Sequence, residues 1–363
     1  MQEDFHYYAT YCAACIAGYS PEEASELCYS ANFVDLCSAT FLNGLGAPVS
    51  AATTQLNMEM ADTKMNRTGR QGITRVWSSF HFLPADLSAD PKKGSRQYKE
   101  KYRLICGPNG DLLKDTIDLA KGKSLQHIGI SMHVLADTWA HRYFAGTPSL
   151  VINNISGDVF ELFEEGDAFR EKKIAFRHSL SGSDDLENSV YTSSIFQISE
   201  NAVMNLGHGR AGHLPDYSFI RYRYMPAWGG YEELVKDNPA DYLQAFTQMI
   251  YALKYLHGEL ETFETDTYDY PAIGPWEEEI RRILQKRQLI ACDDWRELGE
   301  RISGKAVVPF ERDRYCVEYL KAAKEEESNT FLGKFILGAV EQKNMVTRKI
   351  CESGSRLAGT LIE

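Results

Sequence analysis

The sequence of 363 residues predicts an all-α fold, a multi-helix bundle around one central metal-ligand helix with a helical C-terminal extension. Apolar residues recur at helical spacing along most of the chain, and no convincing run of alternating β-branched residues is present. The composition, 44% hydrophobic and 25% charged, is that of an ordinary folded protein rather than a disordered or fibrous one.

The N-terminal helices have the plainest boundaries. Residues 4–18 show helical periodicity and many small residues. Ser20, Pro21 and Glu23 then predict a helix start. Ser20 can cap the helix, proline fits its first position, and Glu23 completes a capping box. This second helix is expected to run to about Cys37.

The same helical periodicity predicts the elements in the middle of the chain. We expect further helices over 50–65, from Leu112 or Ser124 to Tyr143, and over 153–170, 187–206 and 239–264. Two glycine-rich or polar segments are expected to be irregular, namely 67–84 and 90–110.

The stretch 270–275 (YPAIGP) is the best candidate boundary, because proline and glycine separate two helical runs there. We therefore expect a metal-binding helical domain over 1–268. A helical C-terminal extension follows over 276–363, with helices at 276–291, 294–303 and 311–350. The alternative is that this extension packs as part of the same domain.

Charge and composition exclude several partners. The net charge of −12 and the lack of a dense basic block argue against duplex nucleic acid. No run of about 18 apolar residues predicts a membrane span. The N-terminus opens with two acids and lacks the basic segment of an exported precursor.

Eight cysteines show no spacing typical of a disulfide framework, which suits reduced thiols in the cytoplasm. Cys12 and Cys15 have the CxxC spacing of a redox or zinc pair. They lie in helix-patterned sequence without a preceding strand or a second pair, which favours plain core cysteines.

The central helix contains the main candidate metal ligands. In ISMHVLADTWAH, His133, Asp137 and His141 follow one another at intervals of four, so they share one side of the helix. Ile130 and Val134 occupy the same sector, which predicts that this side is buried. A buried carboxylate needs a partner, and a divalent metal such as zinc between imidazoles provides one. The alternative is a buried hydrogen-bond network.

Three residues outside this helix are further candidate ligands. Asp35 ends an otherwise apolar face of the second helix, where a carboxylate again needs a cation, although it could also cap a helix or form a salt bridge. His6 in the first helix and His81 in the SSFHFLP turn are candidates only because the other potential metal ligands are present in the same chain.

The glycine-rich segment GHGRAGH holds His208 and His213, with Asp216 just beyond. Its glycines match GxGxxG, but no strand or βαβ unit precedes it, so a dinucleotide site is excluded. We expect this turn to orient the side chains of His208 and His213 towards the predicted metal site. A rival donor pair is His257 and Glu261, one turn apart on the 239–264 helix.

A helix-one histidine, a helix-two aspartate, a loop histidine and HxxxD on a central helix stand here in that order. This set is similar to that of the zinc-dependent phospholipase C and fungal single-strand nuclease superfamily. The chain also resembles an uncharacterised bacterial family with the same set, over most of residues 1–268. The resemblance implies an all-helical pocket that holds three zinc ions and hydrolyses phosphodiesters with metal-activated water.

Carried over to this chain, the resemblance assigns one zinc ion to Asp35, His81, His133 and Asp137. Asp137 then bridges to a second ion held partly by His6, and His141 and His208 hold the third. The superfamily's processed N-terminus, whose amine and carbonyl bind zinc, has no evident counterpart, since no signal peptide precedes Met1 and no tryptophan stands first. The expected number of ions is therefore one to three.

The preferred hypothesis is a metal-dependent hydrolase of phosphate esters, in which Asp35 or Asp137 orients the attacking water. Arg210, and with it His213, could bind the substrate, whereas Arg142 falls on the wrong helix face. The alternative is a metal-stabilised structural or interaction protein without catalysis. A phosphohydrolase of the HD type is disfavoured, because no adjacent His-Asp pair occurs.

Overall fold

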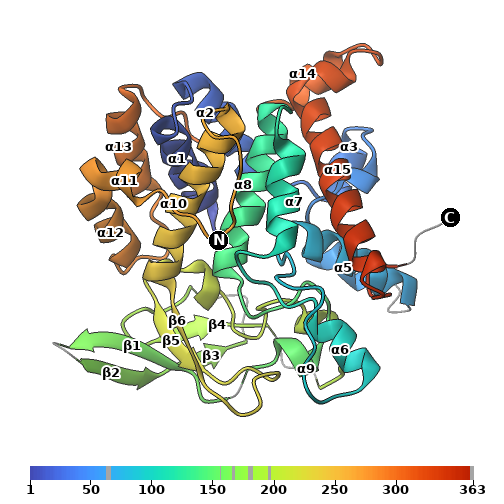
Figure 1. The fold of residues 1–363 in the computed structure, drawn as a ribbon, viewed down its shortest axis with the longest axis vertical. Coiled ribbons are helices and arrows are strands. Elements are labelled where there is room, and N and C mark those ends of the chain that lie inside the picture. The colour runs from blue at the N-terminus through green and yellow to red at the C-terminus, as the bar shows by residue number, and fades with distance from the viewer. Residues whose placement is uncertain (63–66, 156, 166–167, 179–182, 195–197, 360–363) are drawn as a thin grey trace.

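A computed structural model describes residues 1–62, 67–155, 157–165, 168–178, 183–194 and 198–359, with helix α8 (Leu125–Ala140) at the centre (Figure 1). Every residue of α8 after Leu125 is buried. Four helices pack around it, namely α2 (Pro21–Phe33), α7 (Asp111–Ala120), α10 (Asn238–His257) and α15 (Phe331–Glu352). This arrangement explains why α8 is apolar on nearly all sides.

The N-terminal segment runs through the core beside α8. A π-helical turn, η1 (Asp4–Ala9), continues into α1 (Thr10–Ile16), close to the helix predicted over 4–18. The predicted start of α2 is confirmed, because Glu23 N donates to Ser20 Oγ (3.3 Å) and Ser20 N donates to Glu23 Oε2 (2.9 Å).

The C-terminal helices share the apolar core of the N-terminal part. Helices α12 (Glu277–Gln285) and α13 (Cys292–Ser303) pack on the side of η1, α1 and α10. The Trp295 ring of α13 lies edge-on to Phe5, with 6.1 Å between ring centroids. One continuous cluster of buried apolar side chains therefore extends from Met1 to Ala358.

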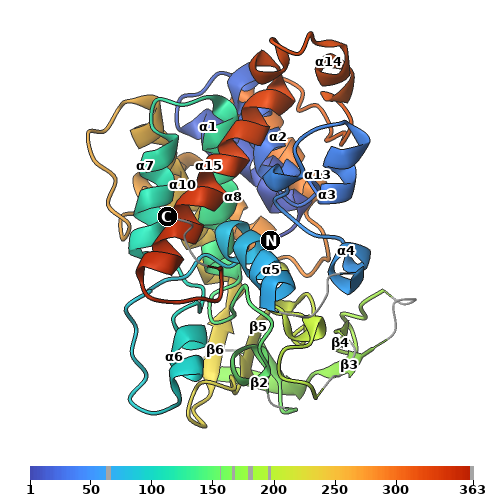
Figure 2. The ribbon, with the colours of Figure 1, turned by 90° about the vertical axis from the view of Figure 1, so that its right-hand side faces the viewer.

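The prediction of an all-α fold is wrong. Helices make up 52% of the chain, and two sheets lie beyond the end of α8 (Figure 2). The antiparallel sheet has the order β2-β1-β5-β6, and its strands are β1 (Phe160–Glu165), β2 (Ala168–Lys173), β5 (Arg221–Tyr224) and β6 (Leu234–Asp237). A parallel pair joins β3 (Ala175–Arg177) to β4 (Val190–Thr192). The fold is mixed α/β, and the helices expected at 153–170 and 187–206 are largely strands and turns.

The segment 67–84 also differs from its prediction as an irregular loop. Most of it is helix α5 (Arg67–Phe80). Its buried side chains Ile73, Val76 and Phe80 form a helical stripe. This tertiary burial outweighs the roughly 1 kcal/mol that each helical glycine costs.

The remaining elements are short. The helices are α3 (Ala39–Gly44), α4 (Asn57–Asp62), α6 (Arg96–Tyr102), α9 (Leu150–Asn153), α11 (Tyr270–Ile273) and α14 (Cys316–Lys321). The single turns are η2 (Val49–Ala51), η3 (Val203–Asn205), η4 (Leu214–Asp216), η5 (Gly274–Trp276) and η6 (Glu327–Asn329). Of the predicted 50–65 helix, residues 63–66 lie outside the described ranges. Within those ranges no helix combines the length and apolar character needed to cross a membrane.

Candidate metal centre

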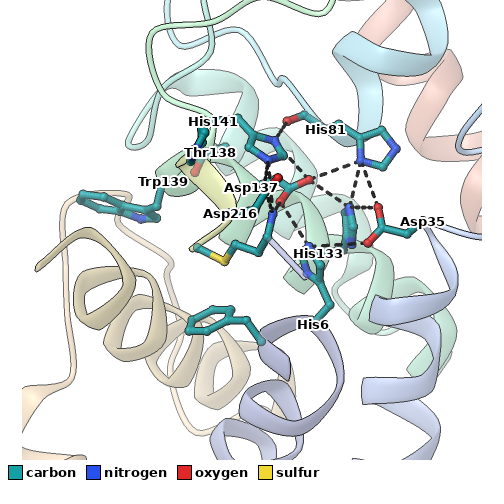
Figure 3. A network of polar contacts seen from close by, with 12 residues as sticks. His6, Asp35, His81, His133, Asp137, Thr138, Trp139, His141 and Asp216 are labelled. Atoms are coloured by element: carbon teal, nitrogen blue, oxygen red, sulfur yellow. Dashed lines mark hydrogen bonds and ion pairs between the residues drawn. The ribbon is translucent and has the colours of Figure 1, made fainter. Parts of the chain in front are cut away.

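Eight buried or half-buried polar residues meet where α8 ends (Figure 3). We call them the His/Asp cluster, and they are His6, Asp35, His81, His133, Asp137, His141, His208 and Asp216. They come from η1, the ends of α2, α5 and α8, and the segment before β5. The structure thus brings together all seven residues predicted to bind metal.

Helices α2 and α8 approach closely because of Gly129. A Cβ atom at this position would lie only 2.3 Å from the Leu27 carbonyl oxygen and 2.5 Å from Ser30 Cβ. The close approach lets His133 Nδ1 donate a hydrogen bond to the Ala31 carbonyl oxygen (2.9 Å). His133 Nε2 is thereby left as an acceptor that faces the cluster.

Three further histidines are oriented in the same way. His81 Nε2 donates to the Thr53 carbonyl oxygen (3.0 Å), and His141 Nδ1 donates to that of His81 (2.7 Å). His208 Nδ1 donates to the carbonyl oxygen of Gly212 (2.7 Å). Since a carbonyl oxygen can only accept, each contact fixes the proton on the outer ring nitrogen. When such a ring is neutral, its other nitrogen presents a lone pair to the cluster.

These inner nitrogens face other acceptors at short range. His133 Nε2 lies 3.3 Å from His81 Nδ1, and Asp137 Oδ2 lies 3.1 and 3.3 Å from the same two nitrogens. Such lone pairs repel one another unless a cation lies between them. Donors bound tetrahedrally to zinc at 2.0–2.1 Å are about 3.3 Å apart. The observed spacings fit that geometry.

His6 projects from the π-helical turn η1, a type of helix often found at functional sites. Its side chain is fully buried and stacks on His133, with 3.9 Å between ring centroids. In the described part of the chain neither ring nitrogen has a hydrogen-bond partner, although Nε2 lies 3.2 Å from Asp137 Oδ1. Burial lowers the pKa of His6 to about 4, so the ring is neutral.

Asp216 completes a third group and was not predicted as a ligand. Its Oδ1 lies 3.0 Å from His141 Nε2, and its Oδ2 lies 3.7 Å from His208 Nε2. Its place three residues after His213 was the available signal. The intervening Pro215 argued against a His/Asp pair on a regular helix, and the structure forms the single turn η4 instead. His213 Nδ1 lies 3.0 Å from Asp216 Oδ2, with its ring mostly exposed.

The α-amino group of Met1 also lies in the cluster, and both ribbon views show the N-terminus near the centre of the molecule. The amine is 2.8 Å from Asp137 Oδ1, 3.3 Å from Asp216 Oδ1 and 3.2 Å from His141 Nε2. The Met1 amine therefore lies at the polar centre of the molecule. Burial lowers the pKa of this amine, but the three nearby carboxylates outweigh burial and raise it to about 11.

The two innermost carboxylates are held ionised. Burial alone raises the pKa of Asp137, but His141, the Met1 amine and His133 outweigh it, so the pKa lies well below its usual value. Burial also raises the pKa of Asp216. The charges of His208 and the Met1 amine and the hydrogen bonds from His141 and His213 outweigh burial and lower this pKa well below its usual value. The centre therefore concentrates ionised carboxylates and imidazole groups, the donor types that divalent transition metals prefer.

A model of a family of unknown function, DUF6765, matches residues 1–350 and so includes the whole His/Asp cluster. The chain belongs to the DUF6765 family. No curated protein and no solved structure matches the chain. The similarity to the zinc-dependent phospholipase C superfamily stays a prediction.

Other predicted residues of this DUF6765 chain lie apart from the cluster. His257 ends α10 and packs on Tyr19, and its Nδ1 lies 3.5 Å from Glu259. The structure therefore brings His208, not His257, to the centre. Arg210 is buried and donates hydrogen bonds to the side-chain oxygens of Asn154 (2.6 Å) and Asn205 (3.2 Å).

The side chains of the His/Asp cluster differ in their exposure to solvent. The side chains of His6, His133 and Asp137 are at most 1% exposed, whereas Asp35 is 36% and His208 17% exposed. In this DUF6765 chain the cluster thus approaches the surface at Asp35 and His208.

Proposed function

We propose that this chain is a metal-dependent hydrolase of phosphate esters, with zinc ions held by the His/Asp cluster. The observation that carries the proposal is the set of inward-facing ring nitrogens, whose protons are fixed on the outer nitrogens by backbone carbonyl groups. A hydrogen-bond network would place a donor opposite each acceptor. When the rings are neutral, His133 Nε2 faces His81 Nδ1 and Asp137 Oδ2, which are acceptors as well.

Three ligand sets follow if each ring nitrogen binds one ion. The first set is Asp35, His81, His133 and Asp137. The second is His6, the Met1 amine after loss of its proton, and the other oxygen of Asp137. The third is His141, His208 and Asp216. Asp137 is shared by the first two sets and so becomes the residue on which the cluster depends.

The bound ions would lower the pKa of water towards about 7 and neutralise charge on a phosphate group. Asp35 is the better candidate to orient water, because its carboxylate is 36% exposed, whereas that of Asp137 is 1% exposed. Several cations around a shared carboxylate suit a substrate that carries its own negative charge. This supports a phosphate ester over a neutral carbonyl compound.

A second candidate function is a metal-stabilised structural protein without catalysis. The nearly complete burial of His6, His133 and Asp137 favours it, because structural zinc sites are closed to solvent. The partial exposure of Asp35 and His208 argues for the hydrolase, since a substrate must reach an open coordination position.

We also infer a reducing compartment, the cytoplasm, from the cysteines. All eight are unpaired. Cys12 is fully buried and donates to the Trp295 carbonyl oxygen (3.5 Å), and burial raises the pKa of its thiol well above the usual value. Such a thiol is inert and behaves as a core residue.

The test combines metal analysis with an assay on bis(4-nitrophenyl) phosphate. We expect bound zinc in the wild type and hydrolysis that stops on chelation and returns with zinc. Asp35→Asn should reduce turnover at least tenfold, and the exposed control Asp293→Asn should not. Stoichiometric zinc without turnover on any of a panel of phosphodiesters and phosphomonoesters would support the structural alternative.

A further inference from the structure

A second polar pocket lies away from the His/Asp cluster, on the side of the molecule that carries α5, α6 and the end of α15 (Figure 1). Its volume is about 330 Å³, within the range of small-molecule sites. Four of the side chains that line it are basic, and they are Arg70, Arg96, Lys101 and Arg356. Glu100 is the one acidic side chain among the described lining residues.

The concentration of positive charge is unusual for this chain, whose net charge is −12. The basic residues come from segments far apart in the sequence, on α5, on α6 and after α15. The cluster is therefore assembled by the fold and does not follow from a basic stretch of sequence. Folding like charges together costs free energy unless counter-charges are present.

The charges near the pocket do not balance. Lys101 is 3% exposed and its Nζ lies 2.7 Å from Glu200 Oε1, so this pair is neutral. Arg96 is paired with Glu100, with 3.0 Å between Nε and Oε1, and points largely into solvent. Arg356 is exposed, and its guanidinium makes no ion pair or hydrogen bond with any residue that the structure describes. Lys101 and Arg96 are each balanced by a carboxylate, so the positive charge of Arg356 remains without a described counter-charge at the mouth of the pocket.

Neutral hydrogen-bonding groups complete the lining. Thr74 and Thr147 are nearly fully buried, and their hydroxyl oxygens lie 3.0 Å apart. Gln71 Nε2 donates to the Arg356 carbonyl oxygen (3.0 Å), which fixes the segment after α15 against α5. The backbone that carries Arg356 is thereby held in place before any ligand arrives, which reduces the entropic cost of binding.

We propose that this pocket binds a small molecule that carries a phosphate group. Guanidinium groups match phosphate oxygens in paired hydrogen bonds, and the threonine, glutamine and asparagine side chains of the lining suit its remaining oxygens or the attached polar group. The site is separate from the proposed hydrolytic centre. Thr74 lies seven residues before His81, or roughly 10 Å along the axis of α5.

The test is calorimetric titration of the metal-loaded chain with phenylphosphonate, which carries a phosphate-like group that hydrolases do not cleave. We expect saturable binding, and at least tenfold weaker binding in the double variant Arg96→Ala, Arg356→Ala. The matched control is Arg281→Ala, Arg348→Ala, two half-exposed arginines on α12 and α15 outside the pocket. It should bind as the wild type does. Arg356→Lys keeps the charge without the paired donors and should give an intermediate affinity.

Both pocket variants change exposed side chains, so they should retain the thermal stability, zinc content and diester hydrolysis of the wild type. Unchanged phenylphosphonate affinity in the Arg96→Ala, Arg356→Ala variant would place the binding at the metal centre and overturn the proposal. Failure of the wild type to bind phenylphosphonate at millimolar concentration would overturn it as well. The proposed hydrolase has its own test, the zinc-dependent assay, so failure of the pocket proposal and failure of the hydrolase proposal are distinguishable.

Discussion

The position of one proton on each imidazole ring decides what the polar centre can bind. Backbone carbonyl groups at Ala31, Thr53 and His81 hold that proton on the outer nitrogen of His133, His81 and His141, respectively. The carboxylate of Asp137 then lies among lone pairs and the Met1 amine. A protein seldom buries so many acceptors together without a cation that compensates them.

Asp137→Asn tests the shared carboxylate. The amide is nearly isosteric, but it lacks the charge and can present only one oxygen. We expect the number of bound zinc ions to fall by at least one, with a loss of affinity of at least 100-fold at the remaining sites nearby. Elemental analysis after dialysis measures this. The control Asp293→Asn should keep the wild-type zinc content, and so would Asp137→Asn if the cluster were only a hydrogen-bond network.

The dependence of zinc binding on pH follows from His81. Burial lowers the pKa of this ring, but the hydrogen bond to Asp137 and the charge of Asp35 outweigh burial and raise it above the usual value. Protons and zinc compete for the same nitrogen, so zinc affinity falls as pH drops below this raised pKa, roughly tenfold per pH unit for each proton displaced. Zinc retention measured between about pH 8 and pH 5 should decline, and a flat profile would contradict His81 as a ligand.

Extension of the N-terminus tests the amine of Met1. Two residues placed before Met1 convert the amine into an amide, which keeps no charge for Asp137 and Asp216 and has no lone pair for a metal. We expect the loss of one zinc ion and a lower unfolding temperature. The same two residues added after Glu363 are the control. Equal zinc content and stability in both extended proteins would show that the amine has no role.

Among the elements, the packing of α2 on α8 is the contact that positions the site. Gly129→Ala places a methyl group against the Leu27 carbonyl oxygen, which forces the helices apart. We expect a destabilisation of about 1–3 kcal/mol and weaker zinc binding, because the bond from His133 to Ala31 lengthens. Denaturant unfolding measures the first effect and zinc titration the second.

Gly72→Ala is the matched control for Gly129→Ala. Gly72 lies inside α5, and apart from its chain neighbours and its own helix backbone no atom of the described residues lies within 4 Å of an added Cβ. Alanine there should stabilise the protein by about 0.5–1 kcal/mol, through helix propensity alone. If both glycine variants behaved alike, the close approach of α2 and α8 would not determine the geometry of His133.

The elements that sequence alone predicts are those with local signals. The capping box at Ser20 and the apolar stripes of α8 and α10 are such signals, and the helices formed as expected. The local sequence pattern of β1 was misleading. Its residue Glu161 is 1% exposed and pairs with Arg287, 126 residues further along the chain. A glutamate is expected to be exposed unless a distant partner is known. The alternation of buried and exposed side chains along β1 could therefore not be recognised from the sequence.

The candidate site shows the same limit. His133, Asp137 and His141 follow from helical spacing, and Asp35 follows from its place at the end of an apolar helix face. His6 and His81 became candidates only because these other potential ligands were present. Asp216 was missed because η4 follows a glycine-rich turn whose path depends on tertiary contacts. At Gly212, which has φ +60°, a Cβ atom would lie 1.9 Å from the Thr192 carbonyl oxygen. The position of this turn cannot be read from spacing.

For the whole molecule, the centre links segments that are distant in sequence, from Met1 to Asp216. Ions bound there would stabilise the native state relative to the unfolded chain. Two ions, each at 100 times its dissociation constant, contribute about 5 kcal/mol. Chelation should therefore lower the unfolding temperature by about 5–10 °C, as measured by scanning calorimetry, and zinc should restore it. No shift on chelation would argue against structural coupling of metal and fold.

The most direct test of the metal centre is an anomalous-difference map from crystals of the zinc-loaded chain, recorded at the zinc absorption edge. We predict at least two peaks within about 2.0–2.2 Å of His/Asp cluster ligands, one of them on each side of the Asp137 carboxylate. A map without any peak between His6, His81, His133 and Asp137 would contradict the assignment of this centre as a metal site.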